Sequence, residues 1–333
     1  MRRKLYKYRE CNSRTLEMIV SDKIFFADPS TFNDPLDSKP NLFVDISVEN
    51  LRNILHSLVR QRVSAELSSA AAVMKYSGPK TQDRIRRRSQ RAAEDILAEI
   101  SYNSGGPAYE MDDPEKYLLA YEIEKELLKR YDKGVFSLAE RATCPLMWSH
   151  YGGQHRGVCL GYSVPDDVSG DLFKIDYGGK RLVDASSVAA MLEKKSGAQE
   201  NVDGAVLLRK SLEWRYEREW RLLGTRGLQD SKLELEEITF GLRCTDVERY
   251  VIVKSLKDRG RPIKFFQICQ QHGHFSLSKT PLDTSELCIN YPRRARYIYE
   301  VFRDVSISEK PVRYNSTDIM EETDEATDSR SGS

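Results

Sequence analysis

The most constraining feature of this 333-residue chain is a long helical block set between two strand-rich segments. Residues 48–131 hold three stretches of helical character, separated by the glycine- and proline-containing breaks YSGP and NSGGP. Before this block, LYKYR (5–9) and KIFFADP (23–29) are short β-favouring runs with helical spacing between them. After residue 134 short β-favouring runs dominate, interrupted by one helix predicted over 184–212. This order predicts an α+β fold with a central mixed or antiparallel sheet and a helical insertion.

Composition limits the broad class of the protein. We expect residues 1–310 to form one α+β domain, with the insertion at about 48–131, and the acidic residues 311–333 to be disordered. Lysine and arginine number 52 against 51 aspartates and glutamates, so the net charge of +1 gives no general attraction to nucleic acid or to a membrane. No stretch approaches the roughly 20 apolar residues of a membrane span, and the six scattered cysteines lack the spacing of a zinc site or a disulfide framework. We therefore expect a cytoplasmic protein with no bound metal and no membrane contact.

Nucleic-acid binding would need a local patch, and the chain has one dense basic run within the helical block. On a helix the five arginines of this run, between residues 84 and 91, are distributed most of the way round the axis, which is typical of a solvated face. The alternative is that they pair with nucleic-acid phosphates. Both interpretations stay open for Arg84, Arg86, Arg87, Arg88 and Arg91. The sequence identifies no protein partner.

The stretch EWRYEREWRLL (213–223) has the charge spacing of a candidate site. If its second half is a strand, Glu217, Glu219 and Arg221 share one face because side chains alternate with period two. Two neighbouring carboxylates raise one pKa, whereas an arginine keeps the other carboxylate ionised, so the pair would hold different roles. The alternative is a surface ladder of salt bridges beside buried tryptophans.

A second candidate stretch is MWSHYGGQHRG (147–157), which gathers scarce aromatic and histidine residues before two glycines. His150 could orient a substrate hydroxyl, and Tyr151 could stack on a planar ring. Trp148 belongs to the same aromatic group. The alternative for His150 is a satisfied core or capping residue.

Two further groups of candidates lie near the N-terminus. FNDPLD (32–37) is typical of an Asx turn before proline, and Asn33, Asp34 and Asp37 are also candidates for ligand binding. Arg9 follows Tyr8 at the end of the first predicted strand, where its guanidinium could bind a phosphate or form a structural ion pair. No dinucleotide fingerprint, phosphate loop, nucleophile elbow or H-E-x-x-H motif occurs in the sequence.

Taken in order, these clusters resemble the bacterial family of domain of unknown function 2971. The family pattern has a tyrosine-rich strand, P-x-x-F-N-D-P, M-W-x-H-Y followed by H-x-G, a lysine before W-x-x-E-x-E-W-R, and F-G-x-R. The resemblance covers roughly residues 4–280, with a glycine here where the family has alanine after the H-Y pair. The matching positions are Leu5–Arg9, Pro29–Pro35, Met147–Tyr151 with His155 and Gly157, Lys210 with Trp214–Arg221, and Phe240–Arg243.

The order of these elements also resembles the ADP-ribosyltransferase fold, whose three motifs carry Arg or His, then Tyr or Ser, then Glu. This resemblance implies an NAD-using enzyme of the defence or toxin type that cleaves the nicotinamide glycosidic bond through an oxocarbenium-like state, without a metal. It implies that Glu219, with Glu217 second, holds the ribose and stabilises the cation, and that Tyr151 and Tyr8 stack on nicotinamide. Arg9 and Arg221 would then bind the pyrophosphate.

Two other functions remain open on the same residues. One is a non-catalytic sensor or interaction module that binds a small ligand such as a nucleotide. The other is a metal-independent hydrolase or nuclease in which His150 works with Glu217 or Glu219 as acid and base.

Overall fold

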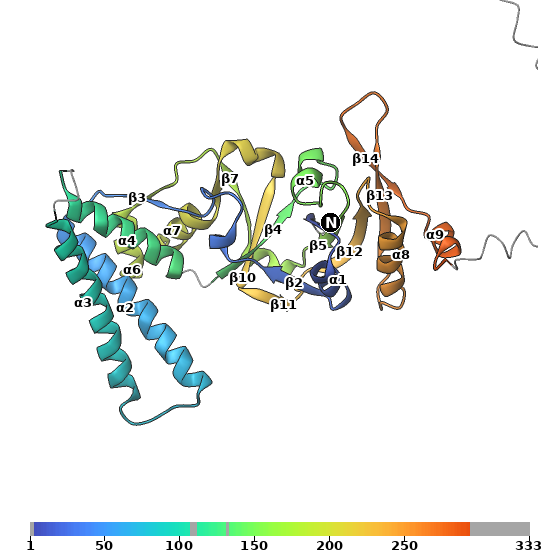
Figure 1. Ribbon diagram of the computed structural model, residues 1–333. Coiled ribbons are helices and arrows are strands. Elements are labelled where there is room, and N and C mark those ends of the chain that lie inside the picture. The colour runs from blue at the N-terminus through green and yellow to red at the C-terminus, as the bar shows by residue number, and fades with distance from the viewer. Residues whose placement is uncertain (1–2, 107–111, 131–132, 294–333) are drawn as a thin grey trace, which may run out of the picture. The chain divides into compact units, whose positions relative to one another are not determined.

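A mixed eight-stranded sheet is the central element of the computed structural model, which describes residues 3–106, 112–130 and 133–293. The chain divides into two compact units, Met1–Ile289 and Asn290–Ser333, and the sheet belongs to the first. The strand order is β14-β13-β12-β5-β1-β4-β10-β6 (Figure 1). β12 and β13 run parallel, whereas the other neighbours run antiparallel. The predicted α+β fold with a central mixed sheet is confirmed; the predicted tail at 311–333 lies outside the described residues.

The strands of this sheet are short, and the central one is apolar throughout. β5 has the sequence VCLGYS and is buried at every position, as expected for a strand that is covered on both faces. Three small strand pairs flank the sheet: β2 (Lys23–Phe26) with β11 (Gly227–Asp230), β3 (Asn41–Phe43) with β8 (Leu182–Asp184), and β7 (Asp176–Tyr177) with β9 (Arg209–Lys210). The strands of the main sheet are β1 (Lys4–Arg9), β4 (Lys133–Ala139), β5 (Val158–Ser163), β6 (Leu172–Lys174), β10 (Glu219–Thr225), β12 (Glu234–Phe240), β13 (Lys264–Gln270) and β14 (Leu277–Pro281).

The sheet opens between two of its central strands. β1 pairs with β5 along its whole length, from Lys4 opposite Ser163 to Arg9 opposite Val158. On its other side β1 meets β4 at a single pair, Tyr6 opposite Ala139. Past that pair the two strands separate, so the backbone of residues 7–9 faces an opening rather than a neighbouring strand. The candidate site described below occupies this opening.

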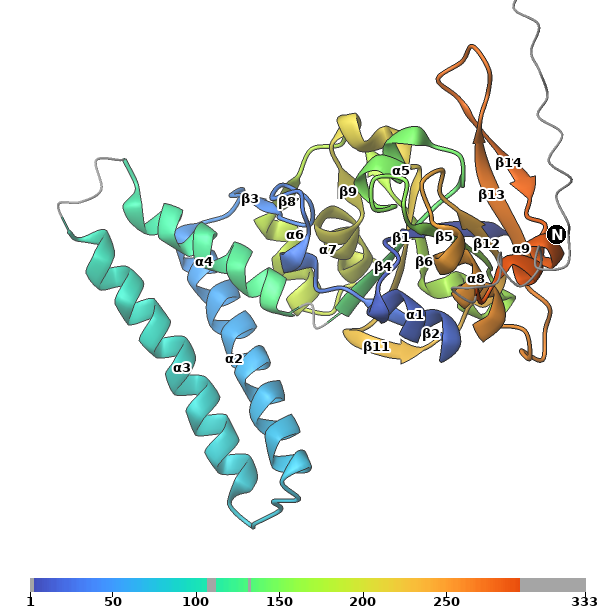
Figure 2. The same ribbon diagram turned by 45° about the vertical axis from the view of Figure 1, so that its right-hand side comes forward.

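The helical block predicted at 48–131 forms three helices, α2 (Val48–Val73), α3 (Thr81–Ser104) and α4 (Pro114–Arg130). α2 and α3 run side by side in both views of the chain (Figure 2). The halves of α2 and α3 that lie away from their connecting turn share an apolar core with α4, α6 (Ala185–Leu192) and α7 (Ala198–Leu207). This core includes the fully buried Leu55 of α2 and Leu119 of α4. The single helix predicted over 184–212 is wrong in extent, because Gly197 takes a left-handed conformation (φ 75°) and starts a new helix.

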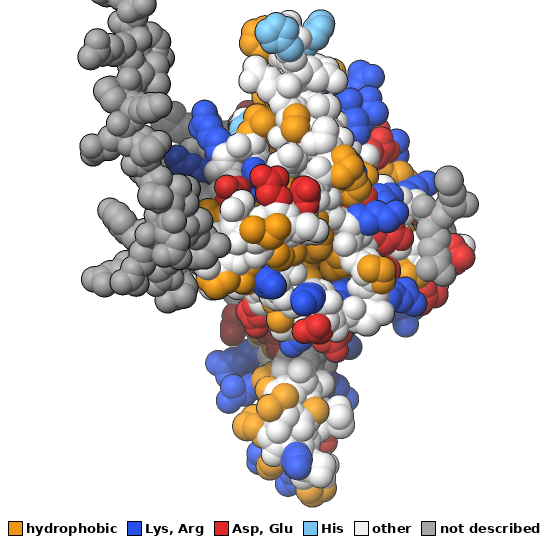
Figure 3. All heavy atoms as spheres, turned by 90° about the vertical axis from the view of Figure 1, so that its right-hand side faces the viewer, with side chains coloured by type: hydrophobic (Ala, Val, Ile, Leu, Met, Phe, Trp, Pro, Cys, Tyr) orange, Lys and Arg blue, Asp and Glu red, His pale blue; other side chains and the backbone are white. Residues whose placement is uncertain are grey.

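Short helices close the ends of the sheet. They are α1 (Ser13–Val20), α5 (Pro145–His150), α8 (Asp246–Ser255), α9 (Thr284–Asn290) and the 3₁₀ turns η1 (Pro29–Thr31), η2 (Asp166–Asp171) and η3 (Leu212–Glu217). The β13–β14 turn carries histidines and a fully exposed Phe275, visible as pale blue and orange spheres in Figure 3. Within the described residues no helix has the length and apolar character required to cross a membrane.

Candidate functional site

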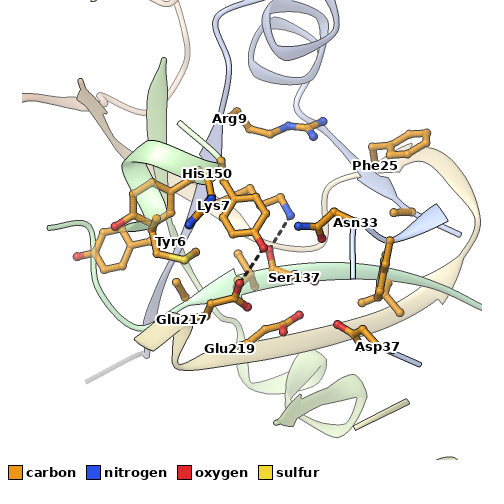
Figure 4. A pocket seen from close by; sticks show the side chains of 18 of the residues that line it. Tyr6, Lys7, Arg9, Phe25, Asn33, Asp37, Ser137, His150, Glu217 and Glu219 are labelled. Carbon is orange, nitrogen blue, oxygen red and sulfur yellow. Dashed lines mark hydrogen bonds between the residues drawn. The ribbon is translucent and has the colours of Figure 1, made fainter. Parts of the chain in front are cut away.

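A cavity of about 400 Å³ occupies the opening between β1 and β4. One wall comes from β1 and β4, a second from α5, and a third from the loop after β2, while the floor comes from the start of β10. Figure 4 shows Arg9 across the cavity from Glu217, Glu219 and Asp37. Polar and aromatic residues at the cavity include Tyr6, Lys7, Tyr8, Arg9, Arg14, Phe25, Phe32, Asn33, Asp37, Ser137, His150, Tyr151, Lys210, Glu217 and Glu219.

The two glutamates reach the cavity from different local structures. β10 begins at Glu219, whereas Glu217 ends the 3₁₀ turn η3, and Arg218 between them is left-handed (φ 46°). The prediction that Glu217, Glu219 and Arg221 share one face of a strand is therefore wrong for Glu217, which lies outside β10. The two carboxylates still meet, because Lys210 Nζ lies 2.6 Å from Glu217 Oε2 and 3.0 Å from Glu219 Oε2.

Arg221 lies beneath this floor and is fully buried. Its guanidinium donates to both carboxylate oxygens of Asp37 at 2.9 and 2.7 Å and to Glu219 Oε1 at 2.9 Å. A further nitrogen donates to the Ser38 hydroxyl and to the Leu207 carbonyl. Arg221 does not line the cavity, so its predicted contact with a pyrophosphate is replaced by a structural role: it fixes the loop at residues 37–38 to β10.

The charges in this cluster do not cancel. Asp37, Glu217 and Glu219 supply three carboxylates, against the two cations Lys210 and Arg221. Burial acts to raise the pKa of Glu219, but Arg221 and Lys210 outweigh it and hold that pKa well below its usual range. Burial raises the pKa of Glu217, because Lys210 opposes the shift only in part and Glu219 adds to it. Glu217 is the least compensated of the three carboxylates, because it shares Lys210 with the other two and has no contact with Arg221.

Tyr151 connects Glu217 to the wall formed by α5. Its hydroxyl donates to Glu217 Oε1 at 2.8 Å, drawn as a dashed line in Figure 4. Burial, followed by the Glu217 carboxylate, raises the pKa of Tyr151, so the phenol stays protonated and remains a donor. His150 is exposed at the same wall and contacts the rings of Trp214 and Tyr216.

Tyr8 and Trp148 form the packed base behind that wall. Trp148 is fully buried, its indole N–H donates to the Ala142 carbonyl at 2.8 Å, and its ring meets Tyr8 edge-on at 5.1 Å between centroids. The Tyr8 hydroxyl donates to the Arg141 carbonyl at 2.7 Å and is 3.3 Å from the Cys144 amide. Trp148 does not line the cavity, and Tyr8 lines it with an almost fully buried side chain. The packing of the two rings holds α5 on β1, and a ligand contact of Tyr8 stays a prediction.

The opposite wall is cationic. Arg9 reaches the cavity from the end of β1, and its Nε is buried without a hydrogen-bond partner among the described residues. Arg14 of α1 lies beside it over the Phe25 ring, with 5.0 Å between the guanidinium carbon and the ring centroid. Lys7 Nζ donates to the Ser137 carbonyl of β4 at 2.8 Å, where the two strands have separated. Burial, followed by Arg9, lowers the pKa of Lys7 to about 7.

Three polar side chains of the FNDPLD loop have different positions relative to the cavity. Asn33 lines the cavity. Asp34 accepts from the Leu36 amide at 2.8 Å, which is the predicted Asx turn, and from the Trp214 indole at 2.7 Å. Asp34 is thus a structural bridge to η3 and does not line the cavity, whereas Asp37 belongs to the charged floor.

Comparison with known proteins gives one result for this chain. Residues 147–222 match a family described as protein of unknown function (DUF2971). The predicted relationship to DUF2971 is confirmed. A search of curated proteins returned no match, and a search of solved structures returned none.

The DUF2971 match spans α5, β5 and the first residues of β10, so it contains Tyr151, Lys210, Glu217 and Glu219. The opposite wall, with Lys7 and Arg9, lies outside the match. Sequence reasoning missed Lys7 because a lysine that alternates with tyrosines in a strand is usually a solvent-facing residue. Lys210 had a signal, since it precedes W-x-x-E-x-E-W-R in the DUF2971 pattern. Among the described residues no group of three or more His, Cys, Asp or Glu side chains is arranged to hold a metal ion.

Proposed function

We propose that this DUF2971 protein binds NAD in the β1–β4 cavity and cleaves its nicotinamide glycosidic bond, transferring ADP-ribose to an acceptor. The observation that carries the proposal is the Glu217 carboxylate, which shares its cationic partner Lys210 with two other carboxylates and faces the same cavity as the cations Arg9 and Arg14. The cavity also falls in the size range of small-molecule sites, about 300–1,000 Å³.

The charge of the floor suits the proposed reaction. When the bond between the ribose carbon and the nicotinamide nitrogen breaks, its electron pair leaves with the neutral nicotinamide, and positive charge develops on the ribose. An acceptor hydroxyl or water then adds its oxygen to that carbon and loses a proton. A cluster with three carboxylates and two cations stabilises such a developing cation, because one negative charge is left uncompensated.

Within the pair of glutamates, the geometry favours Glu217 as the reacting carboxylate. Both glutamates are buried, but Glu219 has Oε1 on Arg221 Nε and Oε2 on Lys210, so cations hold both of its oxygens. Glu217 accepts from one lysine and one tyrosine, and the Tyr151 hydroxyl can rotate toward an incoming ribose hydroxyl. Glu219 then keeps Lys210 charged and in place. This assignment reverses the order of the two glutamates that the sequence suggested.

The other walls suit the remaining parts of a dinucleotide. Arg9 and Arg14 carry guanidinium groups of the kind that bind phosphate oxygens in pairs. Tyr6, Phe25 and Phe32 supply flat apolar surface for a planar ring. Tyr151, held by its bond to Glu217, lines the same cavity.

A second candidate is a non-catalytic nucleotide-binding module. The observation that favours it is that Lys210 bonds both glutamates, so in this conformation both carboxylates already have a cationic partner. In such a module the same residues recognise a nucleotide, and ligand binding occurs without turnover.

The two candidates are separated by nicotinamide release from NAD. We expect the wild-type protein to release nicotinamide and Glu217→Gln to lose at least about a hundredfold in rate, because the developing cation loses its carboxylate. Glu213→Gln is the matched control, since Glu213 is an exposed glutamate one turn earlier in the chain. Binding of NAD with no release would favour the non-catalytic module. Equal rates in wild type and Glu217→Gln would contradict the assignment of Glu217.

A further inference from the structure

The distal part of the α2–α3 hairpin concentrates positive charge that the rest of the chain lacks. Residues 60–91 hold nine lysines and arginines against two acidic residues, a net charge of +7 in a chain whose total is +1. These residues cover the second half of α2, the turn and the first half of α3. The near-neutral composition of the whole protein therefore hides one strongly basic segment.

The arginines of α3 are arranged on its outward side. Ile85, Ser89 and Ala93 are buried at four-residue spacing, and α3 packs on α2 more extensively than on any other element. Four exposed arginines follow the helical spacing i, i+3, i+4 and i+7, which places them in one stripe away from that buried face. They are Arg84, Arg87, Arg88 and Arg91. Arg86 lies outside the stripe, next to the buried face of α3. Together with Arg87 and Arg91 of the stripe and Arg60 of α2, it lines a shallow groove between the helices.

Few of these charges are neutralised within the protein. Arg91 is 3.9 Å from Asp95, and Arg86 is 3.2 Å from Asp83, both in exposed pairs of little energetic weight. Arg60 and Arg88 have no carboxylate partner among the described residues. Arg62 is different, because it bonds the buried Glu126 of α4 at 2.6 Å and so fixes the base of the hairpin. The outer arginines have no comparable structural task.

We propose that this stripe, defined as Arg84, Arg87, Arg88 and Arg91, binds the phosphate backbone of a nucleic-acid duplex. From Arg84 to Arg91 the helix axis advances about 10 Å. One strand of a duplex advances about 3.4 Å per phosphate, so the stripe faces about three consecutive phosphates. The contacts are to backbone charge, and the binding is therefore independent of base sequence. The proposal stands on the hairpin alone and does not rest on the function of the β1–β4 cavity.

An anionic membrane is the rival partner, and the packing of α3 disfavours it. A helix that lies on a membrane buries an apolar face next to its basic face. The apolar face of α3 is already used against α2. Exposed apolar side chains occur at the turn, at Val73 and Met74, so vesicle binding is included in the test. In Figure 3, Lys and Arg side chains (blue) lie at both edges of the lower part of the surface, and hydrophobic side chains (orange) are also exposed there.

The test measures retention of a labelled 24-base-pair duplex of mixed sequence, as DNA and as RNA, at several salt concentrations. We expect the logarithm of the binding constant to fall with the logarithm of salt concentration with a slope of about −3, as for about three neutralised phosphates. Replacement of Arg84, Arg87, Arg88 and Arg91 by Gln should weaken binding by more than tenfold and flatten this slope. Glutamine is a good helix former, and far-ultraviolet circular dichroism verifies that the hairpin is intact.

The matched control replaces four exposed lysines outside the hairpin, Lys180, Lys194, Lys195 and Lys257, by Gln. This control removes the same charge and should bind the duplex like the wild type. Equal loss in both variants would mean general attraction and would overturn the stripe. Absence of duplex binding by the wild type, or binding to phosphatidylserine vesicles alone, would overturn the proposal as well. NAD cleavage by the arginine variant is expected to match the wild type, so failure here and failure at the cavity are distinguishable.

Discussion

At the scale of single residues, the site depends on the different environments of two neighbouring glutamates. The sequence places Glu217 and Glu219 two positions apart, and period-two alternation would make them equivalent neighbours on a strand. The left-handed Arg218 breaks that equivalence, since it lets Glu217 end a 3₁₀ turn while Glu219 starts β10. Glu219 then pairs with both Arg221 and Lys210, whereas Glu217 has only a share of Lys210 and is the less compensated of the two.

Lys7 makes the stability of the protein depend on pH in a defined direction. Burial lowers its pKa from 10.5 to about 7 in the folded protein. Between about pH 7 and 10 the unfolded chain therefore binds a proton that the folded protein does not, and the free energy of unfolding rises with pH because of this group. We expect the wild type to gain stability relative to Lys7→Met as the pH rises from 7 to 9.5. Urea unfolding of both proteins at the two pH values measures the difference.

Lys232→Met provides the comparison for that experiment, because Lys232 is an exposed lysine with only a distant carboxylate at 4.0 Å. The stability difference between wild type and Lys232→Met should stay constant over the same range. If the difference between wild type and Lys7→Met also stays constant, Lys7 is charged throughout and the cavity is more solvated than its geometry indicates.

At the scale of elements, glycines hold the strands around the cavity close together. A Cβ atom on Gly157 would lie 2.0 Å from the Arg9 carbonyl, and one on Gly241 would lie 2.2 Å from the His155 carbonyl. The two glycines also join through a backbone hydrogen bond of 3.0 Å from Gly241 to Gly157. The H-x-G and F-G-x-R motifs thus bring the ends of β5 and β12 against the end of β1.

Gly157→Ala is expected to destabilise the fold and to displace the backbone at Arg9, because neither carbonyl neighbour is a flexible side chain. We expect a loss of about 1–3 kcal/mol in the free energy of unfolding, of the size typical of overpacking. Gly204→Ala is the opposite case: it lies in α7 with no atom within 4 Å of the added Cβ, and should be neutral or slightly stabilising. Denaturant unfolding compares the two, and an unaffected Gly157→Ala would contradict the close packing.

Sequence periodicity predicts some of these elements better than others. The helices α2, α3 and α4 are long and bounded by clear breaks. The sequence predicts them within residues 48–131, because the local spacing of apolar residues is enough to specify a helix. Periodicity does not predict the break between α6 and α7, where Lys194 and Gly197 both take left-handed conformations. The strand order was also beyond prediction. The opening between β1 and β4 depends on which strands pair, and pairing joins residues more than 130 positions apart.

At the scale of the whole molecule, the chain separates its charges into two kinds of environment. The cavity floor holds a negative charge in a buried cluster, and the distal α2–α3 hairpin holds +7 on an exposed surface. The rest of the chain carries a net charge of −6 (+1 − 7), so the composition of the whole chain hides the basic hairpin. Arg9, Asn33, Tyr151, Glu217 and Glu219, which rare motif residues mark in the sequence, line one cavity. Trp148, Asp34 and Arg221 do not line it, and the sequence could not separate them, since a side chain that packs behind a cavity has the same sequence signature as one that faces it.

The most direct measurement is a calorimetric titration of NAD into the wild type, Arg9→Met, Arg14→Met and the exposed control Arg156→Met. The account predicts that wild type and Arg156→Met bind NAD equally, and that Arg9→Met and Arg14→Met each bind at least about tenfold more weakly, a difference of about 1.4 kcal/mol. Arg14 is exposed, so its variant keeps the test valid even if Arg9→Met fails to fold. Absence of NAD binding by the wild type, or equal affinity in all four proteins, would contradict the account.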